Sequence, residues 1–260
     1  MECRLCNGRD LYHYYSQGSE GQYLFYKCTN CGLVNLDLKS ISITDHQKKY
    51  GEIFPDPFDL KINKGSVMTF NFISRYVKTP GNYLDIGCGN GSLLRIAREN
   101  GWKVKGLELS EFMAQNIREQ LDIDVEVSNF LDFEGHGARY DLITLRHVLE
   151  HLPDSRLALR KINNLLNDGG YAEFEFPNIE GISMRFGRFL VRTGIYRKRY
   201  HQDYVPGHCN EFSYRSFKYL LSVSGFELIR WETYTYNPLK NFIYNRFKIG
   251  SKVRAIVKKQ

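Results

Sequence analysis

The segment Tyr83-Leu84-Asp85-Ile86-Gly87-Cys88-Gly89-Asn90-Gly91-Ser92 joins a short apolar strand to a helix through three glycines. Glycine lets the backbone turn sharply there and lets a ligand approach without a Cβ in the way. The open N–H groups at the following helix start favour an anionic group such as a carboxylate. A dinucleotide fingerprint would place its last glycine where Ser92 stands. The turn therefore predicts a small-ligand site, and its spacing argues against a nicotinamide cofactor.

Strand and helix patterns alternate outward from this turn. Strands are expected over residues 83–86, 103–109, 123–127, 140–145, 171–176, 226–233 and 251–258. Helices are expected over residues 66–77 and 92–100, after the cap Ser110, from Asp154 to Gly169-Gly170, and over 213–224. This alternation predicts an α/β fold, a Rossmann-like mostly parallel sheet with helices on both faces.

Glu108 ends the second predicted strand, on the edge of the sheet where ligands of open α/β folds bind. An acid at this point can accept hydrogen bonds from both hydroxyls of a ribose. The alternative is a glycine turn that only packs strand against helix. Because Glu108 is in register with the turn, a nucleoside-containing ligand is favoured.

Three blocks resemble class I S-adenosylmethionine-dependent methyltransferases: YLDIGCGNGSLLRIARENGWKVKGLELSEFM, YDLITLRHVLEHLPD with GGYAEFEFPN, and PGHCNEFSYRSFKYLLSVSGFEL. The resemblance covers residues 82 to 232. It implies that the methionine end of the cofactor is held by the residues of the turn, Asp85, Gly87, Gly89 and Gly91. It further implies that Glu108 binds the ribose, that Asn129 and Phe130 border the adenine, and that Arg146 lies beside the methionine part.

Four of the six cysteines form two paired motifs, Cys3-x-x-Cys6 and Cys28-x-x-Cys31, with 21 residues between them. Two such knuckles supply four thiolates in tetrahedral geometry, the closed arrangement of a structural zinc site. Disulfides or unpaired surface cysteines are the alternatives. The expected organisation is a zinc ribbon over residues 1–38, a connector and helix over 39–81, and the catalytic domain over 82–260. The other two cysteines, Cys88 and Cys209, are expected in the core.

The loop after the fourth strand carries the candidates for catalysis, His147, Glu150 and His151. On a helical turn these residues share a face, and a histidine that titrates near neutral pH suits a general base, with Glu150 orienting it. A packing or capping role is the alternative. Tyr50 and His208 are the candidates for substrate binding, since both lie in segments that border the substrate pocket in related enzymes.

The formal charge of +7 is unevenly distributed. Residues 185–202 contribute +6 and residues 233–260 contribute +7, so the remaining chain is −6. Nine of these 13 cations lie in two basic insertions, at 179–202 and 237–250, that mix cations with aromatic and aliphatic residues. They fit a lid over an anionic substrate or an anionic membrane surface. Nucleic acid is a less favoured partner. The alternative is that the basic residues only form a solvated helix face.

The polar N-terminus MECRLCNGRD and the lack of an apolar run near 18 residues predict a cytoplasmic protein. The basic insertions add a membrane-proximal location to this expectation. The expected function is transfer of a methyl group from S-adenosylmethionine to a small anionic metabolite. The zinc module resembles that of small-molecule methyltransferases, including nucleotide-sugar enzymes. A sugar intermediate of surface-glycan or natural-product biosynthesis is an example of such an acceptor. An RNA methyltransferase and a non-catalytic cofactor-binding module are the alternatives.

Overall fold

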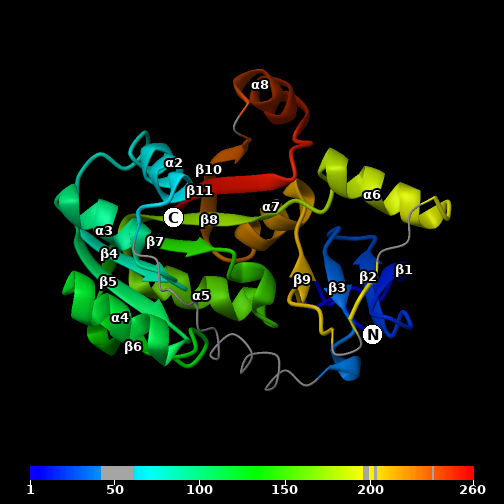
Figure 1. Ribbon diagram of the computed structural model, residues 1–260, viewed down its shortest axis with the longest axis horizontal. Coiled ribbons are helices and arrows are strands. Elements are labelled where there is room, and N and C mark those ends of the chain that lie inside the picture. The colour runs from blue at the N-terminus through cyan, green and yellow to red at the C-terminus, as the bar shows by residue number, and fades with distance from the viewer. Residues whose placement is uncertain (42–60, 196–198, 202–203, 236) are drawn as a thin grey trace.

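The computed structural model describes residues 1–41, 61–195, 199–201, 204–235 and 237–260. Its centre is a seven-stranded sheet in the order β10-β11-β8-β7-β4-β5-β6 (Figure 1). The strands are β4 Asn82–Ile86, β5 Lys103–Glu108, β6 Val125–Val127, β7 Tyr140–Arg146, β8 Leu166–Pro177, β10 Phe226–Thr233 and β11 Lys252–Lys259. Neighbours from β8 through β6 are parallel, and β11 is antiparallel to both β8 and β10. The predicted Rossmann-like, mostly parallel sheet is confirmed.

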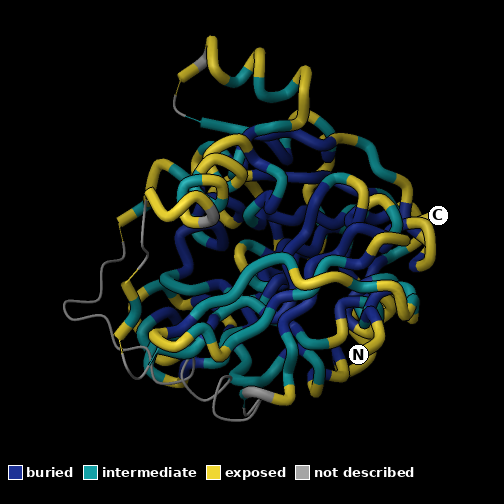
Figure 2. Tube along the Cα trace, turned by 90° about the vertical axis from the view of Figure 1, so that its right-hand side faces the viewer, coloured by how far each residue is buried: buried dark blue, intermediate teal, exposed yellow. Residues whose placement is uncertain are grey.

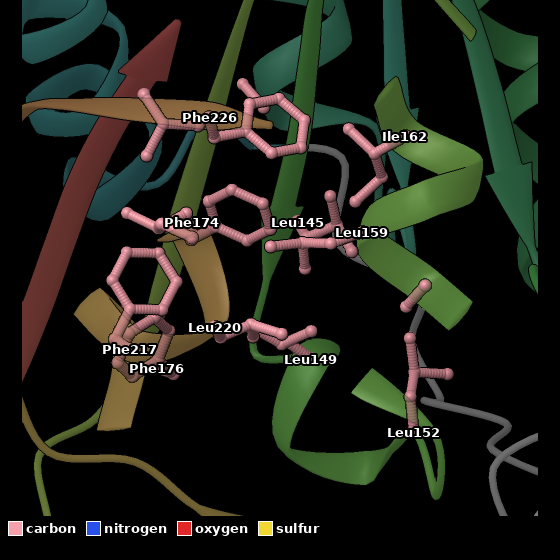
Figure 3. Packing of buried hydrophobic residues seen from close by; sticks show 14 of the residues in the cluster. Leu145, Leu149, Leu152, Leu159, Ile162, Phe174, Phe176, Phe217, Leu220 and Phe226 are labelled. Atoms are coloured by element: carbon pink, nitrogen blue, oxygen red, sulfur yellow. The ribbon is translucent and has the colours of Figure 1, made fainter. Parts of the chain in front are cut away.

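Helices cover both faces of this sheet. The helices of the body are α2 Lys64–Ile73, α3 Ser92–Glu99, α4 Glu111–Leu121, α5 Ser155–Leu165 and α7 Tyr214–Ser222. One buried cluster joins α2, α3 and α4 to side chains of the sheet such as Tyr83 and Leu142. The other joins α5 and α7 to the alternate residues, such as Leu145 and Phe174 (Figure 3). Successive side chains along each strand point to opposite faces of the sheet, so the same strands contribute to both buried clusters.

The predicted helix starts are confirmed at their caps. Ser110, Asp154 and Ser213 each accept a hydrogen bond from the backbone N–H three residues on. The predicted end of one helix at Gly169-Gly170 is wrong, because α5 ends at Leu165. Leu166 is extended and pairs with Tyr140, so the sheet takes over before the glycines are reached.

A second sheet, in the order β1-β2-β3-β9, carries the N-terminal segment. Its strands are β1 Leu11–Gln17, β2 Tyr23–Cys28, β3 Val34–Leu36 and β9 Asn210–Glu211, so the last strand comes from the second half of the chain. Leu5 and Leu33 pack into the same buried cluster as Phe176 and Phe217. The N-terminal segment therefore shares its sheet and its core with the catalytic body (Figure 1). The module boundary expected at residue 38 stays a prediction.

Two further helices, α6 Ile182–Arg192 and α8 Pro238–Phe247, lie within the basic insertions. Short 3-10 turns complete the described part: η1 Leu38–Ser40, η2 Gly135–Gly137 and η3 Leu149–His151. Among the described residues, no helix has the length and apolar content to cross a membrane.

Candidate active site and cysteine cluster

The glycine turn after β4 has the backbone that its sequence requires. Gly87, Gly89 and Gly91 have φ values of 70°, 56° and 71°, in the left-handed region that side chains disfavour. A Cβ on Gly87 would come within 2.5 Å of a methyl group of Val148, whereas a Cβ on Gly89 would meet open space. Gly87 is therefore fixed by packing, and Gly89 leaves room for a ligand.

Glu108, at the carboxyl end of β5, is locked in place by backbone donors. Its Oε2 accepts a hydrogen bond from the Gly89 N–H at 2.9 Å. Its Oε1 accepts from the N–H groups of Leu109 at 2.8 Å and Ser110 at 3.1 Å. The carboxylate therefore bridges the glycine turn to the start of α4, at the position where the sequence predicts ribose binding.

A cavity of about 220 Å³ opens at this edge of the sheet. Its walls bring together seven of the predicted site residues and six neighbours: Ile86, Gly87, Leu107, Glu108, Leu109, Ser128, Asn129, Phe130, Arg146, His147, Val148, His151 and Leu152. Asn129 uses its Oδ1 to accept from the Leu131 N–H at 3.0 Å, and its second lone pair remains for a ligand. The cavity thus joins the predicted ribose, adenine and catalytic residues.

Asp85 lies fully buried near the end of β4, directly before Ile86 and Gly87 of the cavity wall. Its Oδ1 accepts from the Thr144 hydroxyl at 2.5 Å, and its Oδ2 has no hydrogen bond among the described residues. Burial raises the pKa of Asp85 to about 6, while Arg146 and Thr144 oppose the rise. Arg146 donates to the Ser66 hydroxyl at 3.1 Å, and its Nε is also without a partner in the described structure.

These orphaned groups fit S-adenosylmethionine. An unsatisfied buried carboxylate oxygen needs a donor, which the cofactor's ammonium supplies, and the Arg146 Nε needs an acceptor, which its carboxylate supplies. The turn at Gly89 is open to the ligand, and Glu108 faces the same cavity. The fold and these groups together fit a methyltransferase that uses S-adenosylmethionine.

The chain belongs to the methyltransferase-domain family, whose model matches residues 68–230. The ubiquinone biosynthesis O-methyltransferase of Coxiella burnetii (strain Dugway 5J108-111) is 26% identical over 185 residues, which cover 65% of this chain and 74% of that protein. A SAM-dependent methyltransferase from Archaeoglobus fulgidus has a TM-score of 0.56 at 18% identity, covering 75% of this chain and 93% of that chain. Magnesium protoporphyrin IX methyltransferase from Synechocystis with bound SAH has a TM-score of 0.53 at 17% identity, covering 84% and 94%.

The predicted catalytic residues gather on the loop after β7. His147 Nδ1 lies 3.3 Å from Glu150 Oε1. The helical turn expected over His147 to His151 is wrong at its start, because the 3-10 turn begins at Leu149 and His147 has a left-handed φ of 56°. His151 Nδ1 lies 2.5 Å from the carbonyl oxygen of Gly207. A carbonyl only accepts, so Nδ1 carries a proton. In the neutral ring the lone pair is then on Nε2, which is the tautomer of a base that acts through Nε2.

His208 also lies beside these residues, with its ring centroid 5.0 Å from that of His151. Ligand atoms of Glu150, His151 and His208 all lie within 4.8 Å of one another. Tyr50, the other residue predicted to bind substrate, lies outside the described residues.

The four cysteines of the paired motifs converge within 4.8 Å. The Sγ atoms of Cys3 and Cys31 are 3.5 Å apart, as are those of Cys6 and Cys28. These distances exceed a disulfide bond of about 2 Å and are close to the edge of a tetrahedron with Zn–S bonds of about 2.3 Å. All four cysteines are free thiols, so the cluster fits Zn²⁺. The remaining two, Cys88 and Cys209, are buried as expected.

Some residues of the site were absent from the sequence prediction. Thr144 holds Asp85, and its position two residues before Arg146 on β7, on the same face, was an available signal. Glu211 lies near His208, 3.7 Å from Oε1 to Nδ1, and its Oε2 is buried without a partner in the described structure. Gly207, which orients His151, acts through its carbonyl, and sequence carries no signal for that.

Proposed function

We propose that the protein methylates a hydroxyl oxygen of a small acceptor, with His151 as the base. The observation that carries this proposal is the hydrogen bond from His151 Nδ1 to the Gly207 carbonyl, on the wall of the cavity that holds the cofactor residues. The printed name of the Coxiella burnetii relative, an O-methyltransferase, supports oxygen as the acceptor atom.

The reaction is a displacement at the methyl carbon. When bound, S-adenosylmethionine would supply an electrophilic methyl group on its sulfonium, and S-adenosylhomocysteine would be the product that leaves. Glu108 and Asp85 would hold the cofactor, and His151 Nε2 would accept the proton of the acceptor hydroxyl as its oxygen takes the methyl group. Phe130, Val148 and Leu152 line the cavity with apolar surface. Alignment of the two reactants supplies much of the rate.

The sequence prediction and the names of the relatives point to different acceptors. A sugar intermediate was expected, whereas the curated relatives are named for ubiquinone biosynthesis. A screen for S-adenosylhomocysteine release should therefore include a catechol such as 3,4-dihydroxybenzoate and a nucleotide sugar such as UDP-glucose. An RNA substrate is the contrasting arm.

The base is tested by His151→Gln, which keeps a polar side chain and removes the imidazole. We expect turnover to fall by about 10²- to 10⁴-fold, because a positioned general base contributes that much. Affinity for S-adenosylhomocysteine should stay unchanged. His136→Gln is the matched control, since that histidine is exposed and borders no part of the cavity. Undiminished turnover in His151→Gln would refute the assignment.

We also propose that Cys3, Cys6, Cys28 and Cys31 bind one structural Zn²⁺. Four protein thiolates leave no position for a catalytic water, and the sulfur separations support tetrahedral binding. The metal would hold the first and second knuckles of the N-terminal sheet together. Its effect on the site would run through β9, which pairs with β3 and directly follows the loop of His208.

A further inference from the structure

The helix α8 presents its polar side to the protein and its apolar side to solvent. Asn245 accepts from the Thr233 N–H at 2.5 Å, and Asn241 accepts from the Thr235 N–H at 2.5 Å and donates to its carbonyl at 2.9 Å. The opposite side carries four exposed apolar side chains, Leu239, Phe242, Ile243 and Phe247. Surface helices normally bury the apolar face, so this one is turned outward by specific hydrogen bonds.

The helix α6 repeats the pattern. Arg188 turns toward the body, where it donates to the Ile179 carbonyl at 2.7 Å and stacks over the Tyr14 ring at 4.9 Å. Ile182, Phe186 and Phe189, at the i, i+4 and i+7 positions of one face, are exposed. Phe186 is 60% exposed and Phe242 of α8 is 75% exposed, although both are large apolar residues.

The two helices meet at one junction. The Ile182 N–H, at the start of α6, donates to the Ile249 carbonyl just beyond α8 at 2.6 Å. Asn178 donates to the carbonyls of Lys248 and Gly250 at 3.0 Å each. Both helices project from the upper part of the molecule, and α8 stands out from the body (Figures 1 and 2). The end of α8 and the start of α6 therefore lie side by side.

Along α6 and α8 themselves, every charged residue of the sequence is a cation. Arg185 lies on α6, and Lys240 and Arg246 lie on α8. The sequence holds no Asp or Glu between residues 181 and 201 or between 237 and 260. A matching partner must therefore offer negative charge at its surface and an apolar layer directly beneath.

We propose that α6 and α8 dock the protein on an anionic lipid bilayer. A bilayer has anionic headgroups above an acyl interior, which suits aromatic and aliphatic side chains flanked by Lys and Arg. The long basic side chains reach the headgroups while the Phe side chains enter the boundary. Because α6 follows the carboxyl end of β8, docking would bring the membrane close to the edge of the sheet that holds the site. This inference does not depend on the acceptor.

Flotation with vesicles tests the proposal. We expect the full-length protein to bind vesicles of about three parts phosphatidylcholine to one part phosphatidylglycerol, and to bind pure phosphatidylcholine far more weakly. Raising NaCl from about 0.1 M to about 1 M should weaken binding, because the Debye length falls from roughly 10 to 3 Å. Phe186→Ser and Phe242→Ser should each lower the partition coefficient on the order of tenfold.

Leu157→Ser is the matched control, since Leu157 is an exposed apolar residue on α5. It should leave binding unchanged, and all three variants should keep their melting temperature and affinity for S-adenosylhomocysteine. Absence of binding to anionic vesicles would overturn the proposal. Two other results would also overturn it. One is a dimer that Phe242→Ser dissociates, which would mean that the apolar faces mediate self-association. The other is retention on RNA without binding to vesicles.

Discussion

Asp85 is a carboxyl group whose protonation should control cofactor binding. Its pKa is raised to about 6 by burial, and its Oδ2 lacks a hydrogen bond among the described residues. The ionised form attracts the cofactor's ammonium group, so affinity should rise as pH rises through about 6. At one pH unit below that pKa only about one-tenth of the protein has the charge, and affinity for S-adenosylhomocysteine should be roughly tenfold weaker. Calorimetric titrations from pH 5 to 8 measure this.

The raised pKa of Asp85 also makes the free energy of unfolding depend on pH, in the opposite direction to cofactor affinity. The cofactor-free folded chain holds the Asp85 proton up to about pH 6, while the unfolded chain releases it near 4. Its free energy of unfolding should therefore decrease as pH rises through that window. Asp85→Asn should bind more weakly at pH 7.5 and without this pH dependence. Asp124→Asn, on an exposed residue, should retain it. A pH-independent affinity in the unmodified protein would contradict the assignment.

The elements that sequence predicted well are those with local signals. Ser110, Asp154 and Ser213 mark helix starts because a cap bonds to its own first turn. The glycine turn and Glu108 could likewise be located, because their spacing along the chain fixes their place at one sheet edge. The end of α5 could not, since Leu166 is drawn into pairing with Tyr140, a partner far along the chain.

The same reason explains why β9 was not predicted. Asn210 and Glu211 are extended because β3, about 175 residues earlier, pairs with them. The outward orientation of the apolar face of α8 could not be predicted from the sequence either, because its apolar periodicity resembles that of a buried helix. Only the hydrogen bonds of Asn241 and Asn245 to the end of β10 reveal its orientation.

Arg4 connects the first cysteine knuckle to β9. Its guanidinium donates to the Leu36 carbonyl at 2.7 Å, to Asn210 Oδ1 at 3.0 Å and to the Cys209 carbonyl. An ammonium cannot reproduce this planar fork. Arg4→Lys should therefore cost about 1–3 kcal/mol of unfolding free energy and lower turnover, because the adjoining His208 loop loses its support. Thermal unfolding and hydrogen exchange of residues 207–211 measure both effects.

Arg9→Lys is the control for this variant, because Arg9 is exposed and pairs only with Glu2 in the described structure. It should unfold like the parent protein. Faster exchange of residues 207–211 confined to Arg4→Lys would support the connection. Unchanged exchange there, with a lower melting temperature, would show that Arg4 stabilises the knuckle without supporting the loop.

At the scale of the whole molecule, the cysteine cluster is part of the main core. Cys3, Cys28 and Cys31 belong to the same buried cluster as Leu145, Phe174 and Phe217 beneath the sheet. The fourth strand of their sheet leads directly into α7. A ribbon that folded independently would have neither feature. Loss of the proposed metal should therefore lower the stability of the whole chain.

We therefore expect removal of zinc to destabilise the catalytic body as well as the ribbon. Structural zinc sites contribute roughly 10–16 kcal/mol of apparent binding free energy. If about 5 kcal/mol of this is expressed as stability, the melting temperature should fall by about 10–20 °C for a chain of this size. The transition should remain single, and affinity for S-adenosylhomocysteine should decrease with it. Calorimetry with and without a chelator, alongside elemental analysis, measures these quantities.

Cys31→Ser should reproduce the metal-free state, while Cys209→Ala, on a buried cysteine outside the cluster, should retain one zinc per chain. The shared core makes the shape of the transition decisive. If chelation produced an early transition for the ribbon and left the main transition and cofactor affinity unchanged, the two parts would be energetically separate. A single lowered transition would instead mean that four cysteines remote from the methyl donor help to maintain the fold that binds it.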